Sequence, residues 1–257
     1  MSPLVEFKGV DFSYGPVKIL KDLDFSVEPK EILVILGGSG SGKSTILRLL
    51  MGLIDADCGI VNFAGEDLTK VSLARLVQVR VRMGMVFQEG ALFDSLTVGE
   101  NVGYYLLEHG MDNRRGLKEV ERRVRETLKL VGLEHAIDMM PSQLSGGMRR
   151  RVAAARTLIY SPDLILYDEP TTGLDPATCE NFCRVMLDIR RERSVTSIMV
   201  THNMEDAWTV GDKFLLLREG RIEWFGTSAA LKRLGADALP RFFRGENMGA
   251  GRAPSPV

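Results

Sequence analysis

The sequence predicts an α/β fold with a mostly parallel sheet, because continuous apolar runs alternate with segments of helical periodicity. Ile32–Leu36 is apolar throughout and rich in β-branched residues, as expected of a strand buried on both faces. Further candidates for buried strands are Met85–Phe87, Leu164–Tyr167 and Ser197–Val200. Strands of this kind that alternate with helices are typical of an α/β domain.

The N-terminal segment predicts an antiparallel β subdomain. Apolar residues alternate with polar ones along residues 5–14, and a period of two is typical of half-buried strands. We expect two strands here, the second ending at Tyr14. Near the other end of the chain, Phe214–Leu217 and Ile222–Phe225 flank a Glu-Gly pair, which predicts a hairpin.

A helical subdomain is predicted over residues 89–162, which contain no strong strand of their own. Apolar residues recur there every three to four positions, the spacing of one helix face. They are Val120, Val124, Leu128 and Val131.

Composition and charge exclude several classes of protein. The 257 residues are 45% hydrophobic and 26% charged, which is typical of a globular chain and not of a disordered or fibrous one. Lys and Arg number 33 and Asp and Glu 34, so no basic excess indicates a nucleic-acid partner. Three cysteines fit a reducing compartment. No apolar run approaches the roughly 18 residues of a membrane span, and no signal peptide is apparent, so we expect a soluble cytosolic protein.

A phosphate-binding motif follows the first buried run. The segment GGSGSGKST matches G-x-x-x-x-G-K-S, and a helix-like segment comes after it. Glycines let backbone N–H groups turn inward around an anion, and the helix N-terminus adds positive potential. A flexible linker is the alternative, but both flanking elements favour a nucleoside triphosphate site. Its residues are Gly37, Gly38, Ser39, Gly40, Ser41, Gly42, Lys43, Ser44 and Thr45.

Two carboxylates follow the predicted strand Leu164–Tyr167. Because ligands in open α/β sheets lie beyond the carboxyl ends of strands, Asp168 is expected beside the phosphate loop. There it would bind Mg²⁺ together with the Ser44 hydroxyl. Glu169 is the candidate general base for an attacking water. A solvated turn is the alternative, and the upstream loop favours the functional interpretation.

These motifs, with four more in the expected order, resemble the ATP-binding subunit of an ABC transporter. The chain has LSGGM at residues 144–148, where the family has its signature, and GLDP at residues 173–176, where it has its D-loop. Gln88 matches the Q-loop glutamine, His202 the switch histidine, and Tyr14 the aromatic residue that stacks on adenine. The resemblance covers roughly residues 4–240 and implies a P-loop NTPase core that uses ATP and Mg²⁺.

The resemblance also implies a role for each motif. Gln88 would bind Mg²⁺ or the attacking water, and His202 would contact the γ-phosphate as a second catalytic residue. In this family, the phosphate loop and the signature of one chain lie too far apart to share a nucleotide. Two copies would therefore sandwich two ATP molecules. The residues that contact the partner's ATP would be Ser145, Gly146, Gly147 and Asp175.

Simpler interpretations exist for several of these residues. A lone strand tyrosine such as Tyr14 is more often core, and Asp175 could be a turn residue before a proline. The arginine run Arg149–Arg151 after the signature is expected to be a solvated helix face. Met148 stands where glutamine is commonest in the family. This difference narrows the subgroup of the family that the chain resembles, but the implied phosphate contacts are made by Ser145 and the glycine backbone and are not removed.

Two segments resemble the ATPases of Mla-type phospholipid transporters: EGALFDSLTVGENV after Gln88, and SGGMRRRVAAARTL at the signature. This implies integral-membrane permease subunits, a periplasmic lipid-binding partner and a place on the cytoplasmic face of the inner membrane. Leu92, Phe93 and Leu96 would meet the permease or, alternatively, form helical core. An importer of small solutes is the alternative, and a non-transport ABC ATPase is a third.

The expected domain organisation is an ATPase domain over residues 1–240 and a tail over residues 241–257. Phe242 and Phe243 are unusual in a disordered end. We therefore hypothesise that the tail docks on a neighbouring ATPase subunit through the segment from Arg241 to Met248.

Overall fold

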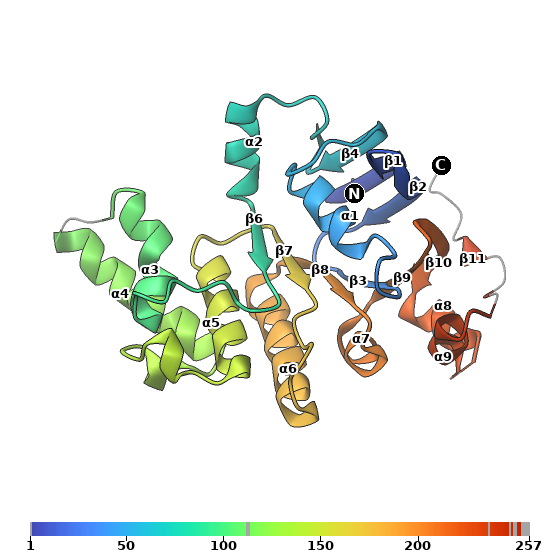
Figure 1. Cartoon of the computed structure of the whole chain (residues 1–257). Coiled ribbons are helices and arrows are strands. Elements are labelled where there is room, and N and C mark those ends of the chain that lie inside the picture. The colour runs from blue at the N-terminus through green and yellow to red at the C-terminus, as the bar shows by residue number, and fades with distance from the viewer. Residues whose placement is uncertain (1, 112–113, 236, 247, 249–250, 253–257) are drawn as a thin grey trace. The chain divides into compact units, whose positions relative to one another are not determined.

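The computed structural model describes all residues except 1, 112–113, 236, 247, 249–250 and 253–257 (Figure 1). It contains two compact units, one made of Met1–Arg80 with Thr196–Val257, the other of Val81–Val195. We call them unit 1 and unit 2 and describe each by itself. Both combine strands with helices, and the predicted α/β fold is confirmed.

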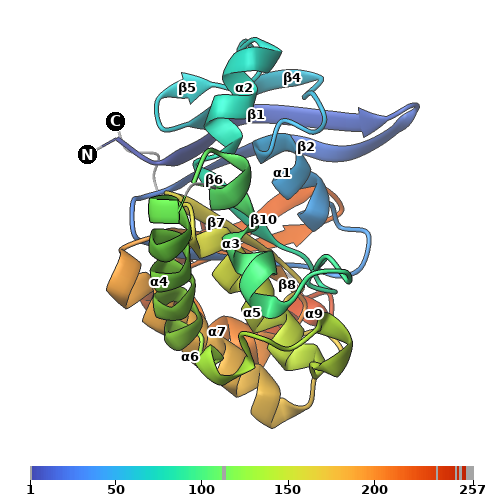
Figure 2. The ribbon, with the colours of Figure 1, turned by 90° about the vertical axis from the view of Figure 1, so that its left-hand side faces the viewer.

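Unit 1 contains a four-stranded antiparallel sheet in the order β2-β1-β4-β5. The two strands expected before Tyr14 are a single strand, because irregular pairing near Gly9 (φ +54°) lets the chain continue through a bulge. Helix α2 lies at the β5 end, where Arg75 forms an ion pair of 2.6 Å with Glu66 (Figure 2). The bounds of these elements are β1 (Val5–Tyr14), β2 (Val17–Val27), β4 (Cys58–Phe63), β5 (Glu66–Asp67) and α2 (Leu73–Arg80).

Five strands of a second sheet belong to unit 1, in the order β11-β10-β9-β3-β8. Every residue of β3 is buried, and β3 runs parallel to both β8 and β9, as the apolar run predicts. The predicted hairpin is β9–β10, and both turn residues, Glu219 and Gly220, have positive φ as a tight hairpin turn requires. The bounds are β3 (Ile32–Leu36), β8 (Thr196–Thr201), β9 (Lys213–Arg218), β10 (Arg221–Thr227) and β11 (Gly251–Arg252).

Four further helices are found among the described residues of unit 1. Helix α1 directly follows the glycine-rich segment, as predicted, and α7 follows β8. The last two helices come after β10 and bring the C-terminal part of the chain back onto the unit, since Leu231, Leu239 and Phe242 are buried. The bounds are α1 (Lys43–Leu50), α7 (Met204–Val210), α8 (Ser228–Arg233) and α9 (Ala238–Phe243).

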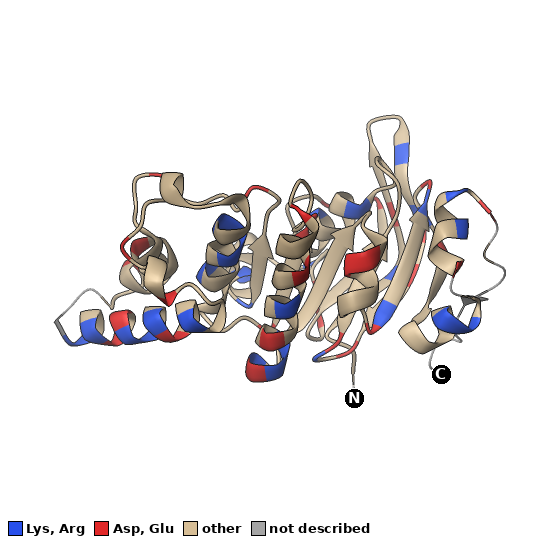
Figure 3. Cartoon of the chain, turned by 90° about the horizontal axis from the view of Figure 1, so that it is seen from below, with Lys and Arg blue, Asp and Glu red and all other residues tan. Residues whose placement is uncertain are grey.

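Unit 2 joins two parallel strands, β6 (Met83–Val86) and β7 (Leu164–Asp168), to a group of helices. The four apolar positions predicted to share a helix face, from Val120 to Val131, are all buried. On the opposite face of α4, acidic and basic side chains alternate and pair, as Arg122 does with Glu119 and Glu126 (Figure 3). The helices are α3 (Val98–Glu108), α4 (Arg114–Leu130), η1 (Glu134–Ala136), η2 (Pro141–Gln143), α5 (Gly146–Leu158) and α6 (Pro176–Arg193).

Among the described residues, no helix combines the length and the apolar character needed to cross a membrane.

Candidate functional site

The phosphate loop of unit 1 has a backbone that requires its glycines. Gly40 and Gly42 have φ of +74° and +106°, in the left-handed region that residues with a Cβ rarely adopt. A Cβ on Gly37 would lie 2.5 Å from the carbonyl oxygen of Leu217, so this position also excludes a side chain. The loop is therefore held tightly against its own unit.

Polar groups of the loop point toward its interior. The Lys43 ammonium donates to the carbonyl oxygens of Gly37 (2.9 Å) and Gly38 (3.1 Å), and this lysine is buried. Among the described residues, the buried Ser41 hydroxyl has no hydrogen-bond partner. The N-cap of α1 is Gly42, which offers no side chain to satisfy the first helical N–H groups. This arrangement is a cradle for an anion.

The strand register places His202 at the same edge of the sheet as the phosphate loop. Thr201 of β8 pairs with Leu36 of β3, and the next residues along the chain are His202 and Gly37. His202 is exposed. Its neighbour Asn203 caps α7, accepting hydrogen bonds from the backbone of the next turn.

Tyr14 is not a core residue, because 45% of it is exposed. Its ring packs edge-on against Phe12, with the ring centroids 4.7 Å apart, and its hydroxyl accepts a hydrogen bond of 3.2 Å from Arg48. An exposed, held aromatic ring suits stacking on a base. The core alternative for Tyr14 is therefore wrong.

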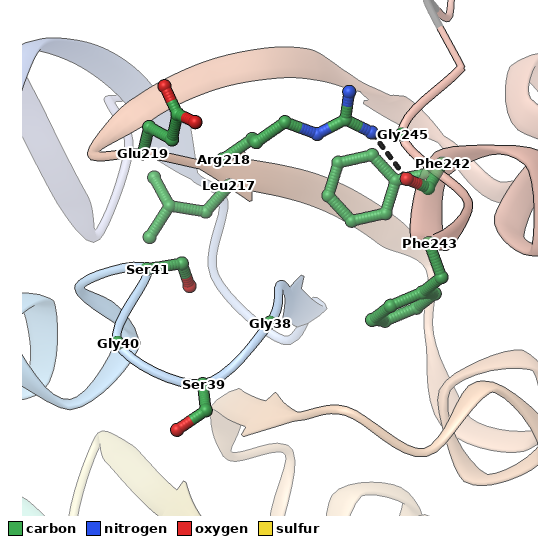
Figure 4. Close-up of a pocket in the computed structure, with 10 residues that line it drawn as sticks. All are labelled: Gly38, Ser39, Gly40, Ser41, Leu217, Arg218, Glu219, Phe242, Phe243 and Gly245. Carbon is green, nitrogen blue, oxygen red and sulfur yellow. Dashed lines mark hydrogen bonds between the residues drawn. The ribbon is translucent and has the colours of Figure 1, made fainter.

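A cavity of about 260 Å³ lies between the phosphate loop and the C-terminal helix of unit 1 (Figure 4). Residues 38–41 form one side, the β9–β10 turn another, and Phe242, Phe243 and Gly245 the third. Arg218 fixes this arrangement, since its guanidinium donates to the Phe242 carbonyl and lies 4.8 Å from the centre of the Phe242 ring. The sequence did not predict that the C-terminal segment borders the phosphate loop.

In unit 2, Gln88 and the acidic pair emerge from the ends of neighbouring strands. Val86 pairs with Tyr167, so the chain continues from β6 toward Gln88 and from β7 into Asp168 and Glu169 at one edge. Glu169 has φ of +48°, uncommon for a residue with a Cβ. Its carboxylate accepts a hydrogen bond of 3.0 Å from the Thr172 hydroxyl, which orients it.

The arginine run after the signature is not a solvated face. Arg150 is only 8% exposed, and its guanidinium donates to the carbonyl oxygens of Gln88 (2.7 Å) and Thr172 (2.6 Å). Arg149 and Arg151 are half-buried and donate to the carbonyl oxygens of Leu144 and Val131. The expectation of a solvated run is wrong because successive helical residues point about 100° apart.

The signature and the D-loop residues lie side by side in unit 2. Ser145 caps α5 and Asp175 caps α6, each accepting a hydrogen bond from the backbone of the first turn. The Thr178 hydroxyl also donates to Asp175 (2.6 Å), and these bonds lower the pKa of its carboxyl. A Cβ on Gly147 would lie 2.3 Å from Thr178 Cγ2, so only glycine allows this approach of the two helix ends.

The residues present fit ATP and Mg²⁺. The loop of unit 1 offers a buried lysine and, among the described residues, a buried hydroxyl without a hydrogen-bond partner, both suited to phosphate. The predicted metal ligands are Ser44, Gln88 and Asp168, a hydroxyl, an amide and a carboxylate whose oxygen atoms are of the kind that Mg²⁺ prefers. Ser44 belongs to unit 1, and Gln88 and Asp168 belong to unit 2.

Comparison with known proteins shows which family the chain resembles. Residues 20–172 match the family model described as ABC transporter. The chain is 38% identical to the sulfate/thiosulfate import ATP-binding protein CysA of Bacillus cereus over 87% of its length, but spans only 61% of that protein. It is 35% identical to the intermembrane phospholipid transport system ATP-binding protein MlaF of Haemophilus influenzae, over 99% of this chain and 95% of that protein.

A solved structure resembles the fold. It is a dimeric ATP-binding cassette in a post-hydrolysis state, bound to ADP and Pi, with a TM-score of 0.76 and 32% identity over 87% of this chain and 98% of that one. The match to the family model covers more than half of the chain. The chain therefore belongs to the ABC transporter family, as an ATP-binding subunit with the ATPase fold of that family.

Proposed function

We propose that two copies of this chain bind two ATP molecules between them and hydrolyse them to drive a transporter. The phosphate loop of one copy would hold each nucleotide, with Tyr14 stacked on its adenine. The signature of the other copy would cover it, through Ser145, Gly146, Gly147 and Asp175. The dimeric, ADP-bound cassette with a similar fold supports this arrangement.

Several side chains would each have a separate role in hydrolysis. Lys43 and the loop N–H groups would bind the phosphates, and His202 would contact the γ-phosphate. The Glu169 carboxylate would take a proton from the attacking water while the water oxygen bonds to the γ-phosphorus and ADP leaves. Bound Mg²⁺, held by Ser44, Gln88 and Asp168, would neutralise charge that develops on the phosphates. The hydrogen bond from Thr172 that orients Glu169 supports its role as base.

The test of this mechanism is the substitution Glu169→Gln, which keeps shape and removes the basic carboxylate. We expect turnover to be abolished while the ATP-bound dimer persists in size-exclusion chromatography. Glu180→Gln is the matched control, because Glu180 is an exposed glutamate on α6 of the same unit. Near-normal hydrolysis by the Glu169→Gln variant would refute Glu169 as the base.

We propose phospholipid as the transported substrate. MlaF, named for intermembrane phospholipid transport, is 35% identical to this chain over 99% of the chain, and the segments after Gln88 and at the signature resemble those of Mla-type ATPases. The partners would be permease subunits in the inner membrane and a periplasmic lipid-binding protein, with this chain on the cytoplasmic face. Import of a small solute is the second candidate, favoured by the 38% identity with the sulfate/thiosulfate protein.

An exposed aromatic pair in unit 2 suits contact with the permease. Phe93 is 43% exposed and Tyr104 39% exposed, and their ring centroids lie 4.8 Å apart. The Arg156 guanidinium lies 5.5 Å from the centre of the Phe93 ring and helps to hold it at the surface. Leu92 and Leu96 are half-buried beside it, so this segment is not simply helical core.

Copurification of the full chain with its membrane partners tests substrate and surface together. A lipid-binding periplasmic subunit that carries glycerophospholipid supports the proposal. A solute-binding subunit, with ATPase activity stimulated by that solute, contradicts it. We expect Phe93→Ser to lose the permease, whereas Leu117→Ser, which alters another exposed apolar residue of unit 2, should keep it.

A further inference from the structure

A buried cation joins the two loops of unit 2 that carry the proposed hydrolytic groups. Arg150 lies in the second turn of α5, five residues after Ser145 of the signature. Its Nε donates to the Gln88 carbonyl oxygen at 2.7 Å and its Nη2 to the Thr172 carbonyl oxygen at 2.6 Å. One planar guanidinium therefore bridges two segments that are 62 and 22 residues away along the chain.

The buried position of Arg150 costs free energy that a purely structural side chain would not require. Burial of its guanidinium lowers the pKa of Arg150, because the charged form is partly removed from water. Both of the bonds described above go to neutral backbone carbonyls, which compensate a buried charge less well than a carboxylate does. A hydrophobic side chain of similar size would fill the same space without that cost.

The two bonds end close to the groups that would act on water. Gln88 is itself the predicted Q-loop residue, and Thr172 donates through its hydroxyl to the Glu169 carboxylate at 3.0 Å. The backbone N–H of Thr172 also donates to the Glu169 carbonyl at 3.3 Å. Arg150 thus holds the turn whose other end sets the carboxylate, and a shift of Thr172 would move Glu169.

We propose that Arg150 is a positioning residue for ATP hydrolysis, which fixes the Gln88 segment and the Glu169–Thr172 turn in one arrangement. This inference rests on the proposed role of Glu169. Arg150 acts through the backbone carbonyls of Gln88 and Thr172. Its loss should therefore lower the rate of the chemical step far more than the binding of ATP.

Steady-state ATPase kinetics of the full chain test the proposal. We expect Arg150→Met to lower kcat by about 10- to 100-fold, the loss expected for hydrogen bonds of a charged donor, with KM for ATP changed by less than about threefold. Arg150→Lys keeps the positive charge but loses the planar guanidinium that donates in two directions, so it should recover part of kcat. Arg151→Met is the matched control, because Arg151 donates to Val131, outside both loops, and should stay within about twofold of wild type.

A double-mutant cycle tests whether Arg150 acts on Glu169 through Thr172. Thr172→Val removes the bond from the hydroxyl to the Glu169 carboxylate but keeps the carbonyl that Arg150 binds, and Thr172→Ser keeps both the hydroxyl and the carbonyl. If Arg150 acts through Thr172, the pair Arg150→Met with Thr172→Val should have a kcat close to that of the worse single variant. Thr172→Ser should behave as wild type. If the two substitutions act independently, the double variant will show the product of the two single losses of kcat, and this result would overturn the proposal.

Two further outcomes are decisive. An equal effect of Arg150→Met and Arg151→Met, or a loss of ATP affinity as large as the loss of kcat, would overturn the positioning role. Should Arg150→Met fail to fold in a thermal melt, Arg150→Lys replaces it in the same cycle. Glu169→Gln is measured beside them: if that variant still hydrolyses ATP, the role of Glu169 fails, whereas coupling between Arg150 and Thr172 is read independently of it.

Discussion

The contact between Gly147 and Thr178 allows a prediction about the signature helix of unit 2. In Gly147→Ala, the new Cβ would lie 2.3 Å from Thr178 Cγ2, and the next atom, Thr178 Cβ, is 3.8 Å away, an ordinary contact. The clash therefore comes from a single methyl group. Thr178 cannot easily turn it aside, because its hydroxyl is bonded to Asp175 at 2.6 Å and β-branched side chains are stiff.

The magnitude follows from the two ways of relieving this clash. A backbone shift of overpacked helices costs about 1–3 kcal/mol, and a new Thr178 rotamer loses the hydrogen bond to the Asp175 carboxylate. Alanine gains at most about 1 kcal/mol over glycine in a helix. We expect Gly147→Ala to lower the free energy of unfolding by about 1–2 kcal/mol.

The assay is urea denaturation of the full chain, with a second substitution as a rescue. Thr178→Ser removes Cγ2 but keeps the hydroxyl bonded to Asp175. In this background Gly147→Ala should be neutral or slightly stabilising, so the two changes should couple by about 1–3 kcal/mol. Circular dichroism follows the helices, and tryptophan fluorescence reports on unit 1, where both Trp208 and Trp224 lie. A double variant as unstable as Gly147→Ala alone would refute this packing argument.

Three further predictions concern unit 1. Lys43→Ala should weaken ATP binding by about 10- to 100-fold in a fluorescent-nucleotide titration, because a charge-assisted phosphate contact is lost; unchanged affinity would contradict it. Bonds from Lys18 and from the Asp22 N–H hold the pKa of Asp11 at about 2, below its ordinary 3.8, so this carboxylate adds stability above pH 4 that is lost as pH falls toward 2. Asp11→Asn should therefore destabilise the fold at pH 7, with a difference that shrinks below pH 4 in denaturant titrations; a constant difference would contradict the assignment. Arg218→Met should speed tryptic cleavage after residues 241 and 244, since the anchor of Phe242 is lost, and an unchanged rate would show that α9 is held by other contacts.

The parallel core could be predicted because its signal is local. Buried parallel strands are continuous apolar runs, and Ile32–Leu36 is buried at every position. Strand β2 gave no such signal, because its buried residues Leu20 and Leu23 are three positions apart and Asp22 between them has φ of +54°. A bulge breaks the period of two, and a sequence pattern of period two cannot follow the chain across it.

The candidate site likewise has a part that could be predicted from the sequence and a part that could not. The phosphate loop is a contiguous motif whose glycines have local reasons, so its residues could be named from the sequence. The border that α9 adds to that loop depends on Arg218 and Phe242, 24 residues apart, and no pattern connects them. The hypothesis that this segment docks on a neighbouring subunit stays a prediction. Phe242 is buried in its own unit, and residues 247, 249–250 and 253–257 lie outside the described part of the chain.

The arginine run shows why identical neighbours need a structure to be told apart. Arg149, Arg150 and Arg151 donate to carbonyl oxygens in three different places: the start of their own helix, the two loops at the strand ends, and the end of α4. Of these three arginines, only Arg150 bonds to both of the segments that are proposed to act in hydrolysis. Because a helix moves as a rigid rod over so short a distance, a displacement of Ser145 at the N-terminus of α5 would displace the Arg150 guanidinium as well. If two copies bind ATP as proposed, contact of the signature with the second copy's nucleotide would then shift Gln88 and, through Thr172, Glu169, which would couple hydrolysis in one site to occupancy of the other.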